Sequence, residues 1–228
     1  MVSIVIPVYR EEQRLPGCLG TVAPGARSRG MELIVVDGGS DDGTVDAAHR
    51  CGATRVIEAP RGRGSQMNAG AAVSRGSLLA FLPADTSLPD DGLEALATVD
   101  QCGLPLAGGF THRFDRRRRL LGAVSCLHNL RSSLTGIFYG DQVPFVRRRI
   151  FLEMGGFRQG VDMEDVEFGA RLRRRVRSRR LAPRVVTSAR RFDEAGDLRA
   201  TAEVLYLLFF WTLLRRAPPS RIFFSPVR

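Results

Sequence analysis

An unbroken apolar run that ends on an aspartate constrains the fold more than any other feature of this sequence. Residues 32–37 read ELIVVD, and the glycine-rich loop 38–43 follows directly. A parallel strand buried on both faces has this continuous apolar pattern, and its carboxyl end faces a ligand cleft. Glycines let backbone approach a ligand closely, while Asp41 and Thr44 can cap a following helix. The segment therefore predicts a nucleotide-binding geometry at Asp37.

Strand and helix patterns alternate four times before residue 110. The expected strands are 2–9, 32–37, 55–58 and 77–82, and the expected helices are 10–21, 43–52, 65–74 and 91–100. Crossovers of helical length imply an α/β fold in which helices flank a mainly parallel sheet. Ligands of such a sheet bind beyond the carboxyl ends of its strands.

The second half of the chain is less regular. We expect strands at 110–114, 141–147 and 184–187 and helices at 118–134, 164–176 and 197–215. A length of 228 residues with 44% hydrophobic residues favours one compact domain with a C-terminal helical extension over two independent domains.

Positive charge is concentrated in this second half. All 34 basic residues are arginines; residues 1–110 contain 9 of them against 13 acidic residues, and residues 111–228 contain 25 against 11. The asymmetry suits a phosphate-bearing acceptor, an anionic membrane surface or a nucleic acid. Coding bias and a solvated arginine-rich face are the alternatives.

The cysteines and the apolar C-terminal segment bear on location. The four cysteines are scattered without a CxxC pair, which favours a reduced, cytoplasmic compartment. Residues 204–214 are strongly apolar but shorter than the roughly 20 residues that cross a bilayer. This segment could dock at the inner membrane face, form a homodimer or pack in the core.

Three acidic positions suit three different tasks. Asp37 lies where a nucleobase or ribose would bind, and Asp85, after the fourth strand, could hold a hard divalent cation that bridges a diphosphate. Asp165 begins a helix, whose N–H groups favour the ionised carboxylate that a general base requires. The plainer alternatives are a helix cap at Asp37, a turn residue at Asp85 and a helix-end charge or ion-pair partner at Asp165.

The order of these motifs resembles the family 2 glycosyltransferases of the GT-A fold over nearly the whole chain. The matching segments are IVIPVYRE at 4–11, IVVDGGSDDGT at 34–44, NAG at 68–70, FLPAD at 81–85, GGF at 155–157 and MED at 163–165. YGDQ at 139–142 and SARRF at 188–192 further resemble a short bacterial subgroup that is associated with radical-SAM and selenodomain proteins.

This resemblance implies an enzyme that moves a sugar from a nucleoside-diphosphate sugar, expected to be a UDP-sugar, to an acceptor hydroxyl with inversion. Residues 1–110 would bind the donor and residues 111–228 the acceptor. Asp165 is implied as the catalytic base and Asp85 as the ligand of Mg²⁺ or Mn²⁺. The family metal motif is usually Asp-x-Asp, but proline at position 83 offers no carboxylate. Waters and donor phosphates would therefore complete the octahedral shell.

The resemblance also implies two groups of binding residues. The nucleotide group is Pro7, Tyr9, Glu11, Asp37, Arg61, Arg63 and Ala84, and the acceptor or phosphate group is Asp141, Gln142, Glu164, Arg190 and Arg191. Arginine forks pair well with phosphate oxygens. Surface charge is the alternative for Arg61 and Arg63, and a loop-holding role is the alternative for Asp141 and Gln142.

Two other functions stay open. A sugar nucleotidyltransferase generally has a glycine-rich basic loop after its first strand, whereas residues 7–12 contain no glycine. A noncatalytic sugar-nucleotide or RNA-binding protein would fit Pro83 and the basic second half, but the interleaved aromatic platform of single-strand binders is missing. We expect a sugar nucleotide and an unidentified acceptor as partners, and no specific nucleic acid.

Overall fold

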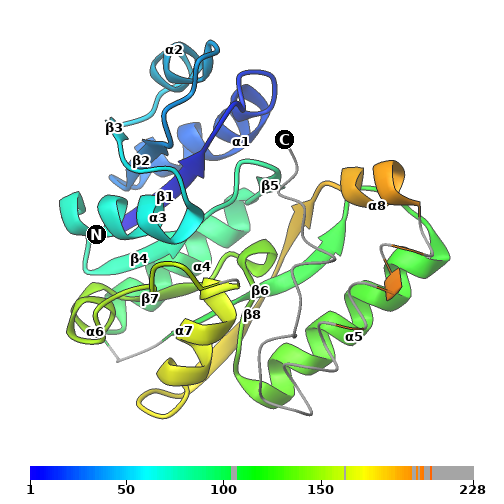
Figure 1. Ribbon diagram of the computed structural model, residues 1–228. Helices are drawn as coiled ribbons and strands as arrows, with labels where there is room; N and C mark the ends of the chain where they lie inside the picture. The colour runs from blue at the N-terminus through cyan, green and yellow to red at the C-terminus, as the bar shows by residue number, and fades with distance from the viewer. Residues whose placement is uncertain (104–106, 162, 197–198, 200, 203–205, 207–228) are drawn as a thin grey trace.

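The computed structural model describes residues 1–103, 107–161, 163–196, 199, 201–202 and 206 (Figure 1). Its strands are β1 (Val2–Val8), β2 (Glu32–Asp37), β3 (Arg55–Glu58), β4 (Leu78–Phe81), β5 (Thr86–Ser87), β6 (Ala107–Phe114), β7 (Phe145–Arg147) and β8 (Ser178–Thr187). Its helices are α1 (Leu15–Ser28), α2 (Thr44–Arg50), α3 (Arg63–Val73), α4 (Asp90–Gln101), α5 (Arg119–Thr135), the 3-10 helix η1 (Gly140–Gln142), α6 (Arg148–Glu153), α7 (Glu164–Leu172) and α8 (Arg190–Ala195).

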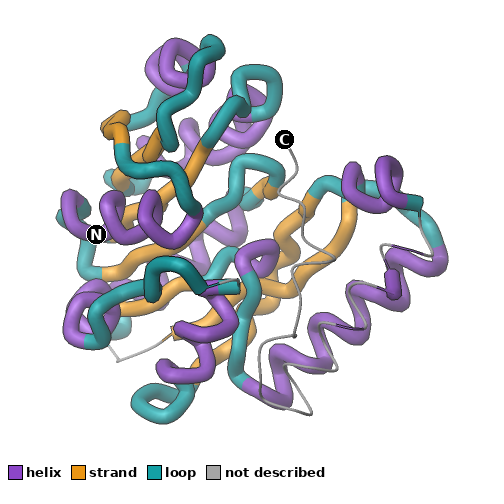
Figure 2. Tube along the Cα trace, in the orientation of Figure 1, coloured by secondary structure: helices purple, strands orange, loops and turns teal. Residues whose placement is uncertain are grey.

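One sheet joins all of these strands in the order β3-β2-β1-β4-β7-β6-β8-β5. The first four pair in parallel, as expected from their continuous apolar sequences. Alternate residues of β1 point to opposite faces: Ile4 and Ile6 belong to the core shared with α1 and α4, and Val5 belongs to the core shared with α3. Helices therefore cover both faces (Figure 2), and the α/β class is confirmed.

β7 runs in the opposite direction to the strands on either side of it. It pairs antiparallel with both β4 and β6, β6 then pairs in parallel with β8, and β5 pairs antiparallel with β8. The predicted strand 141–147 is wrong in its first part, because residues 140–142 form η1 and the strand begins only at Phe145. This arrangement carries the chain back beside β4, at whose end Asp85 lies.

The expected helix 10–21 is shifted. Arg10 has a φ of 54°, and Arg14 N–H bonds back to Glu11 O, so a turn precedes the helix. The helix begins at Leu15 with Pro16 in its first turn, where a missing N–H breaks no helical bond. This turn leaves residues 9–11 as a loop at the carboxyl end of β1.

The predicted final helix at 197–215, with its apolar segment 204–214, lies almost wholly outside the described residues. Within the described ranges, no helix combines the length and apolarity that crossing a bilayer requires.

Candidate functional site

Asp37 ends β2 with its side chain buried at 3% exposure. Its Oδ2 accepts hydrogen bonds from Gly39 N–H at 2.9 Å and from Ser40 N–H at 2.7 Å. The carboxylate therefore closes the loop that follows the strand, as the plainer alternative expects of an Asx residue. Its neighbours in the sheet are Val8 and Glu58, so it lies at the carboxyl edge between β1 and β3.

The loop after β1 supplies an aromatic surface beside Asp37. The guanidinium of Arg61 lies over the Tyr9 ring at 3.9 Å from its centroid, and that of Arg10 lies at 5.4 Å. Glu11 N–H donates to Thr44 Oγ1 at 2.8 Å, which ties this loop to α2. A planar ring with a stacked arginine at the sheet edge is suited to a nucleoside and its phosphates.

Pro7 and Ala84 have no polar side chain, so they can contribute only backbone atoms and surface shape to a binding site. Pro7 lies within β1 opposite Val36 of β2, and Ala84 is a buried residue of the loop that leaves β4. These positions put both residues at the carboxyl ends of neighbouring parallel strands, where a ligand of this sheet binds.

Asp85 follows Ala84 on that loop. Its side chain is exposed, and Thr86 Oγ1 lies 3.2 Å from its Oδ1. The pKa of Asp85 is raised, because surrounding protein restricts its hydration and the negative charges of Glu11 and Asp141 repel its own. The Thr86 hydroxyl and Arg63 oppose this rise. Like charge has therefore gathered around an exposed carboxylate.

Asp165 is held at the start of α7 by three donors. Arg63 Nη2 donates to its Oδ2 at 2.9 Å, and Gly140 N–H donates to the same oxygen at 2.6 Å. Val166 N–H donates to Oδ1 at 2.8 Å. A carboxylate has about four lone-pair positions, so Oδ1, with one donor, keeps a hydrogen-bond acceptor position. Met163 occupies the N-cap position of the helix with a φ of 59° and forms no side-chain capping bond.

Arg63 connects the two halves of the chain. Besides Asp165, it contacts Glu164 Oε1 through its Nε at 3.2 Å. Burial alone would lower the pKa of Arg63, but the charges of Asp165 and Glu164 outweigh it and raise that pKa. The predicted phosphate-binding arginine therefore already has two carboxylate partners.

Asp141 lies between two histidines. Its Oδ1 is 3.0 Å from His128 Nε2, and its Oδ2 is 3.7 Å from His112 Nε2. Although burial alone would raise it, the pKa of Asp141 is well below its usual range, chiefly because of His128. Burial lowers the pKa of His112 to about 4.

Gln142 has the contacts of a structural residue. Its Oε1 accepts from Arg131 Nη2 at 3.1 Å, and its Nε2 donates to Ser132 Oγ at 3.0 Å. The guanidinium of Arg131 also lies 3.6 Å from the centroid of the Tyr139 ring. These contacts favour the loop-holding alternative for Gln142, and the acceptor role stays a prediction.

The two late arginines begin α8. Arg190 contacts Glu194 at 3.4 Å, and the side chain of Arg191 lies outside the described part of the structure. Ser188, two residues before Arg190, donates its N–H to Asp85 O at 3.0 Å. The start of α8 therefore lies close to the Asp85 loop.

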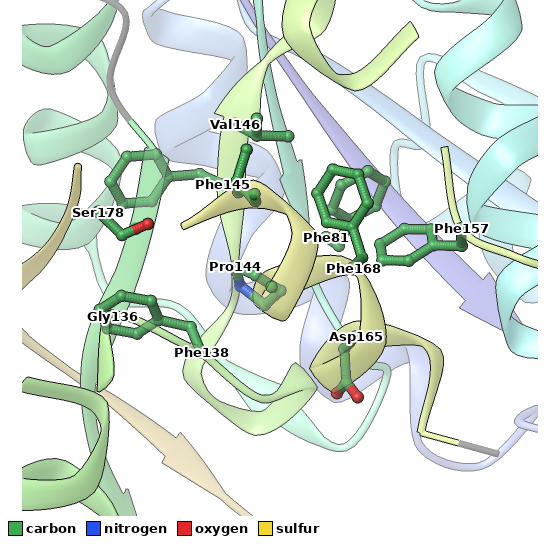
Figure 3. Close-up of a pocket in the computed structure, with 13 residues that line it drawn as sticks. Phe81, Gly136, Phe138, Pro144, Phe145, Val146, Phe157, Asp165, Phe168 and Ser178 are labelled. Carbon is green, nitrogen blue, oxygen red and sulfur yellow. The ribbon is translucent and has the colours of Figure 1, made fainter. Parts of the chain in front are cut away.

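A small apolar cavity lies behind Asp165. It measures about 20 Å³, enough for roughly one water, and phenylalanines form much of its wall. Figure 3 shows the Asp165 carboxylate pointing away from Phe81, Phe157 and Phe168. The cavity is therefore a small packing defect in the apolar core, and the Asp165 carboxylate faces away from it.

Glu11 and Asp141 lie near enough to Asp85 for their negative charges to raise its pKa, and Arg63 interacts electrostatically with both aspartates. Asp37 lies on the same sheet edge, although it has no direct contact with these groups among the described residues. No group of three or more His, Cys, Asp or Glu residues there has the arrangement of a metal centre.

Sequence reasoning missed the histidine pair and the Gly140 N–H. The YGDQ segment at 139–142 was the sequence signal that could have pointed to these contacts, because it contains both Gly140 and Asp141, the partner of the histidines. Strain also marks the site: the three non-glycine residues with positive φ in the described ranges are Arg10, Val143 and Met163, each beside one of its loops.

The model of the family described as Glycosyl transferase family 2 matches residues 3–118, slightly more than half of the chain. Glycosyltransferase AglE from Haloferax volcanii is 33% identical over 116 residues, which cover 47% of this chain and 38% of that protein. The chain therefore spans well under half the length of this curated relative.

Solved structures support the fold. The mannosyltransferase PcManGT from Pyrobaculum calidifontis, in complex with GDP-Man and Mn²⁺, has a TM-score of 0.68 at 23% identity, covering 96% of this chain and 66% of that one. S. aureus TarS 1–349 in complex with UDP-GlcNAc has a TM-score of 0.62 at 15% identity, covering 93% and 73%.

These likenesses confirm the GT-A architecture that the motif order implies, while the resemblance to the radical-SAM-associated subgroup stays a prediction. The match over residues 3–118 includes the strand ends that carry Tyr9, Asp37 and Asp85. The chain belongs to glycosyl transferase family 2.

Proposed function

We propose that the protein is a metal-dependent, inverting glycosyltransferase that moves a sugar from a nucleoside-diphosphate sugar, expected to be a UDP-sugar, to an acceptor hydroxyl. The observation that carries this proposal is the ion pair between Arg63 and Asp165, which are 102 positions apart. It joins the half that would bind the donor, residues 1–110, to the half that would bind the acceptor, residues 111–228. Family membership favours this function over the nucleotidyltransferase and noncatalytic alternatives.

The donor would bind along the carboxyl edge of β1, β2 and β4. The ring of Tyr9 and the stacked Arg61 suit the nucleoside and its first phosphate. Asp37 would accept from the base edge, exchanging part of its present contacts with Gly39 and Ser40. Charge-assisted arginine contacts with phosphate are among the stronger hydrogen bonds in proteins, which supports Arg61 near the diphosphate.

Asp85 fits a hard divalent cation. Its carboxylate is exposed and repelled by Glu11 and Asp141, so a cation would relieve a local excess of negative charge. Bound there, Mg²⁺ or Mn²⁺ would stabilise the charge that develops on the departing diphosphate. With Pro83 in place of a carboxylate, we expect weak affinity for the free ion and stronger binding together with the nucleotide.

In this proposal Asp165 acts as the base. Its Oδ1 would take the proton of the acceptor hydroxyl while that oxygen forms a bond to the anomeric carbon. The bond from the anomeric carbon to the diphosphate breaks on the opposite side, and its electron pair leaves with the nucleoside diphosphate. Arg63 and Gly140 N–H hold Oδ2, which fixes the direction of the other oxygen.

A thermal-shift panel tests donor binding. Nucleoside diphosphates and their sugars would be added with and without Mn²⁺, and a specific ligand should raise the melting temperature by mass action. We expect a UDP compound with Mn²⁺ to give the largest shift. Equal shifts for all nucleotides, or none, would count against the donor site.

Asp165→Asn tests the base. The amide keeps the size of the side chain but cannot accept the proton, so transfer should be abolished while nucleotide affinity stays within a few fold. Glu153→Gln on α6, where Glu153 pairs with exposed Arg149, is the control and should leave transfer unchanged. Turnover that persists in Asp165→Asn would overturn the assignment.

A further inference from the structure

A groove lies apart from the carboxylates of the site described so far and shares with that site only His112, the partner of Asp141. It is bounded by β6, α5 and β8, has a volume of about 740 Å³ and opens to solvent. Six arginines line it, and no acidic residue is among its described lining: Arg113, Arg116, Arg117, Arg118, Arg180 and Arg184. We call it the arginine groove. In Figure 1, α5 lies on the side of the molecule away from β1, β2 and β3.

Most of its positive charge is not neutralised by the protein. Arg116 and Arg118 both approach Asp193, at 4.0 and 2.5 Å. The other four, Arg113, Arg117, Arg180 and Arg184, are exposed and have no ion-pair or hydrogen-bond partner among the residues that the structure describes. Like charges gathered in one concavity repel one another, so an anionic partner would be attracted strongly.

An apolar stripe runs beside this charge on α5. Leu127, Leu130 and Leu134 are 42%, 54% and 78% exposed, and their spacing of three and four residues puts them on one side of the helix. Leu130 also lines the groove. Only five large hydrophobic side chains are exposed in the described ranges, so three on one helix form a distinctive surface.

The opposite side of α5 is already packed. Leu121 and Val124 belong to a buried cluster with Phe192, and Asn129 holds both the N–H and the C=O of His112 in β6. The exposed leucines are therefore not needed to attach the helix. Their burial would require something outside the described chain.

We infer that α5 and the arginine groove dock on an anionic phospholipid surface. Arginines would bind lipid phosphates, and the leucines would enter the boundary between headgroups and acyl chains, as in interfacial amphipathic helices. This inference goes beyond the proposed sugar transfer and does not depend on it.

Other occupants match these features less well. A nucleic acid would use the arginines but not the leucines. The two ring side chains of the described groove lining, His112 and Phe114, pack against each other, and Phe114 also packs against Phe192. A symmetric second copy would place arginines opposite arginines. Residues 203–228 contain one acidic residue, Glu203, against four arginines, so they offer no complementary charge.

Vesicle co-sedimentation of the full chain tests the inference. We expect binding to an equal mixture of phosphatidylcholine and phosphatidylglycerol, little binding to phosphatidylcholine alone, and weakening with salt. Arg117→Glu/Arg184→Glu should lower the partition coefficient at least about tenfold, because each basic residue near such a surface contributes roughly fivefold. Arg173→Glu/Arg174→Glu changes the net charge equally outside the groove and should retain most of the binding.

A second pair tests the apolar part. Leu130→Ser/Leu134→Ser should remove the binding that survives high salt and leave much of the low-salt binding. Circular dichroism and nucleotide thermal shifts would verify that each variant is folded.

Three results would overturn the inference. One is an absence of vesicle binding, or equal binding to neutral vesicles. Another is an equal loss of vesicle binding in the two double-arginine variants, which would show a response to net charge alone. The third is displacement of the protein from vesicles by single-stranded RNA or by inorganic phosphate, with the groove pair abolishing binding of that competitor.

Discussion

Replacing Gly140 with alanine tests whether Arg63 must remain against Asp165. The added Cβ would lie 1.8 Å from Arg63 Nη2 and 2.7 Å from its Cζ, whereas ordinary contacts between heavy atoms are about 3.5–4.0 Å. The guanidinium would have to retreat, so its 2.9 Å contact with Asp165 Oδ2 would open. The backbone itself accepts alanine, because Gly140 is not among the glycines with positive φ.

The solvent exposure of Arg63 and Asp165 determines how much the free energy of unfolding should fall when their ion pair opens. The Arg63 side chain is 43% exposed and that of Asp165 is 5% exposed. Exposed ion pairs contribute about 0–1 kcal/mol, and breaking a buried pair costs about 3–5 kcal/mol. Because Arg63 is partly screened by solvent, we expect the free energy of unfolding to fall by about 1–2 kcal/mol. Sugar transfer should fall about 100-fold, since a displacement of about 1 Å at a reacting group has that effect.

Urea unfolding and steady-state transfer would be measured for Gly140→Ala, Arg63→Ala and the double variant. If the alanine acts through the guanidinium, the double variant should transfer sugar no more slowly than Arg63→Ala alone. Gly20→Ala on α1 is the control, because its added Cβ meets nothing within 4 Å. Transfer by Gly140→Ala at the wild-type rate, or additive losses in the double variant, would refute the reasoning.

Three further outcomes follow from other parts of the structure. Gly70→Ala would put a Cβ 2.4 Å from Val5 Cγ1, so urea unfolding should show a loss of about 1–3 kcal/mol, and an unchanged midpoint would contradict the packing. His112 has a folded pKa of about 4; the unfolded state gains a proton first as pH falls below about 6.5, so stability should drop by about 2 kcal/mol from about pH 7 to about pH 5. His112→Gln should remove most of that slope, which urea titrations at the two pH values would reveal. For Asp85→Asn, calorimetry should find that Mn²⁺ no longer strengthens UDP binding, and a persistent metal effect would place the ion elsewhere.

The parallel half of the fold was predictable because its strands bury both faces. The apolar runs at 2–9, 32–37 and 77–82 require such an environment, and the resulting sheet edge collects Tyr9 and Asp37. These relations are local in sequence or follow from strand order.

β8 shows why the other half was harder to predict. Only 184–187 was expected as a strand, but it begins at Ser178 and includes four positions that are exposed. Its pairing with β6 shifts register between Phe110 and Thr111, where Ala182 and Pro183 are accommodated. A strand that is held mainly by backbone bonds to a distant partner, and interrupted by proline, leaves little periodic apolar signal.

The same difference between local and long-range information applies to the residues of the candidate site. A loop aspartate such as Asp85 can be identified from the residues next to it, whereas the contacts of Asp165 depend on Arg63 and Gly140, which come from other parts of the chain. The MED segment predicts a carboxylate at a helix start, but only the hydrogen bonds from Arg63 and Gly140 to Oδ2 determine which oxygen has fewer partners. Orientation is therefore the information that tertiary structure adds.

Charge balance explains how Pro83 can be compatible with function. Asp85 is already repelled by the negative charges of Glu11 and Asp141, and the arginine that opposes this repulsion, Arg63, also pairs with Asp165. A nucleoside diphosphate would bring further negative charge to this region, so its approach requires additional positive charge. A divalent cation that arrived with the diphosphate would supply that charge and would need only one protein carboxylate, because phosphate oxygens and water would fill its remaining positions. Another carboxylate at position 83 would increase affinity for the free ion, but it would also increase the repulsion among the carboxylates before a cation binds.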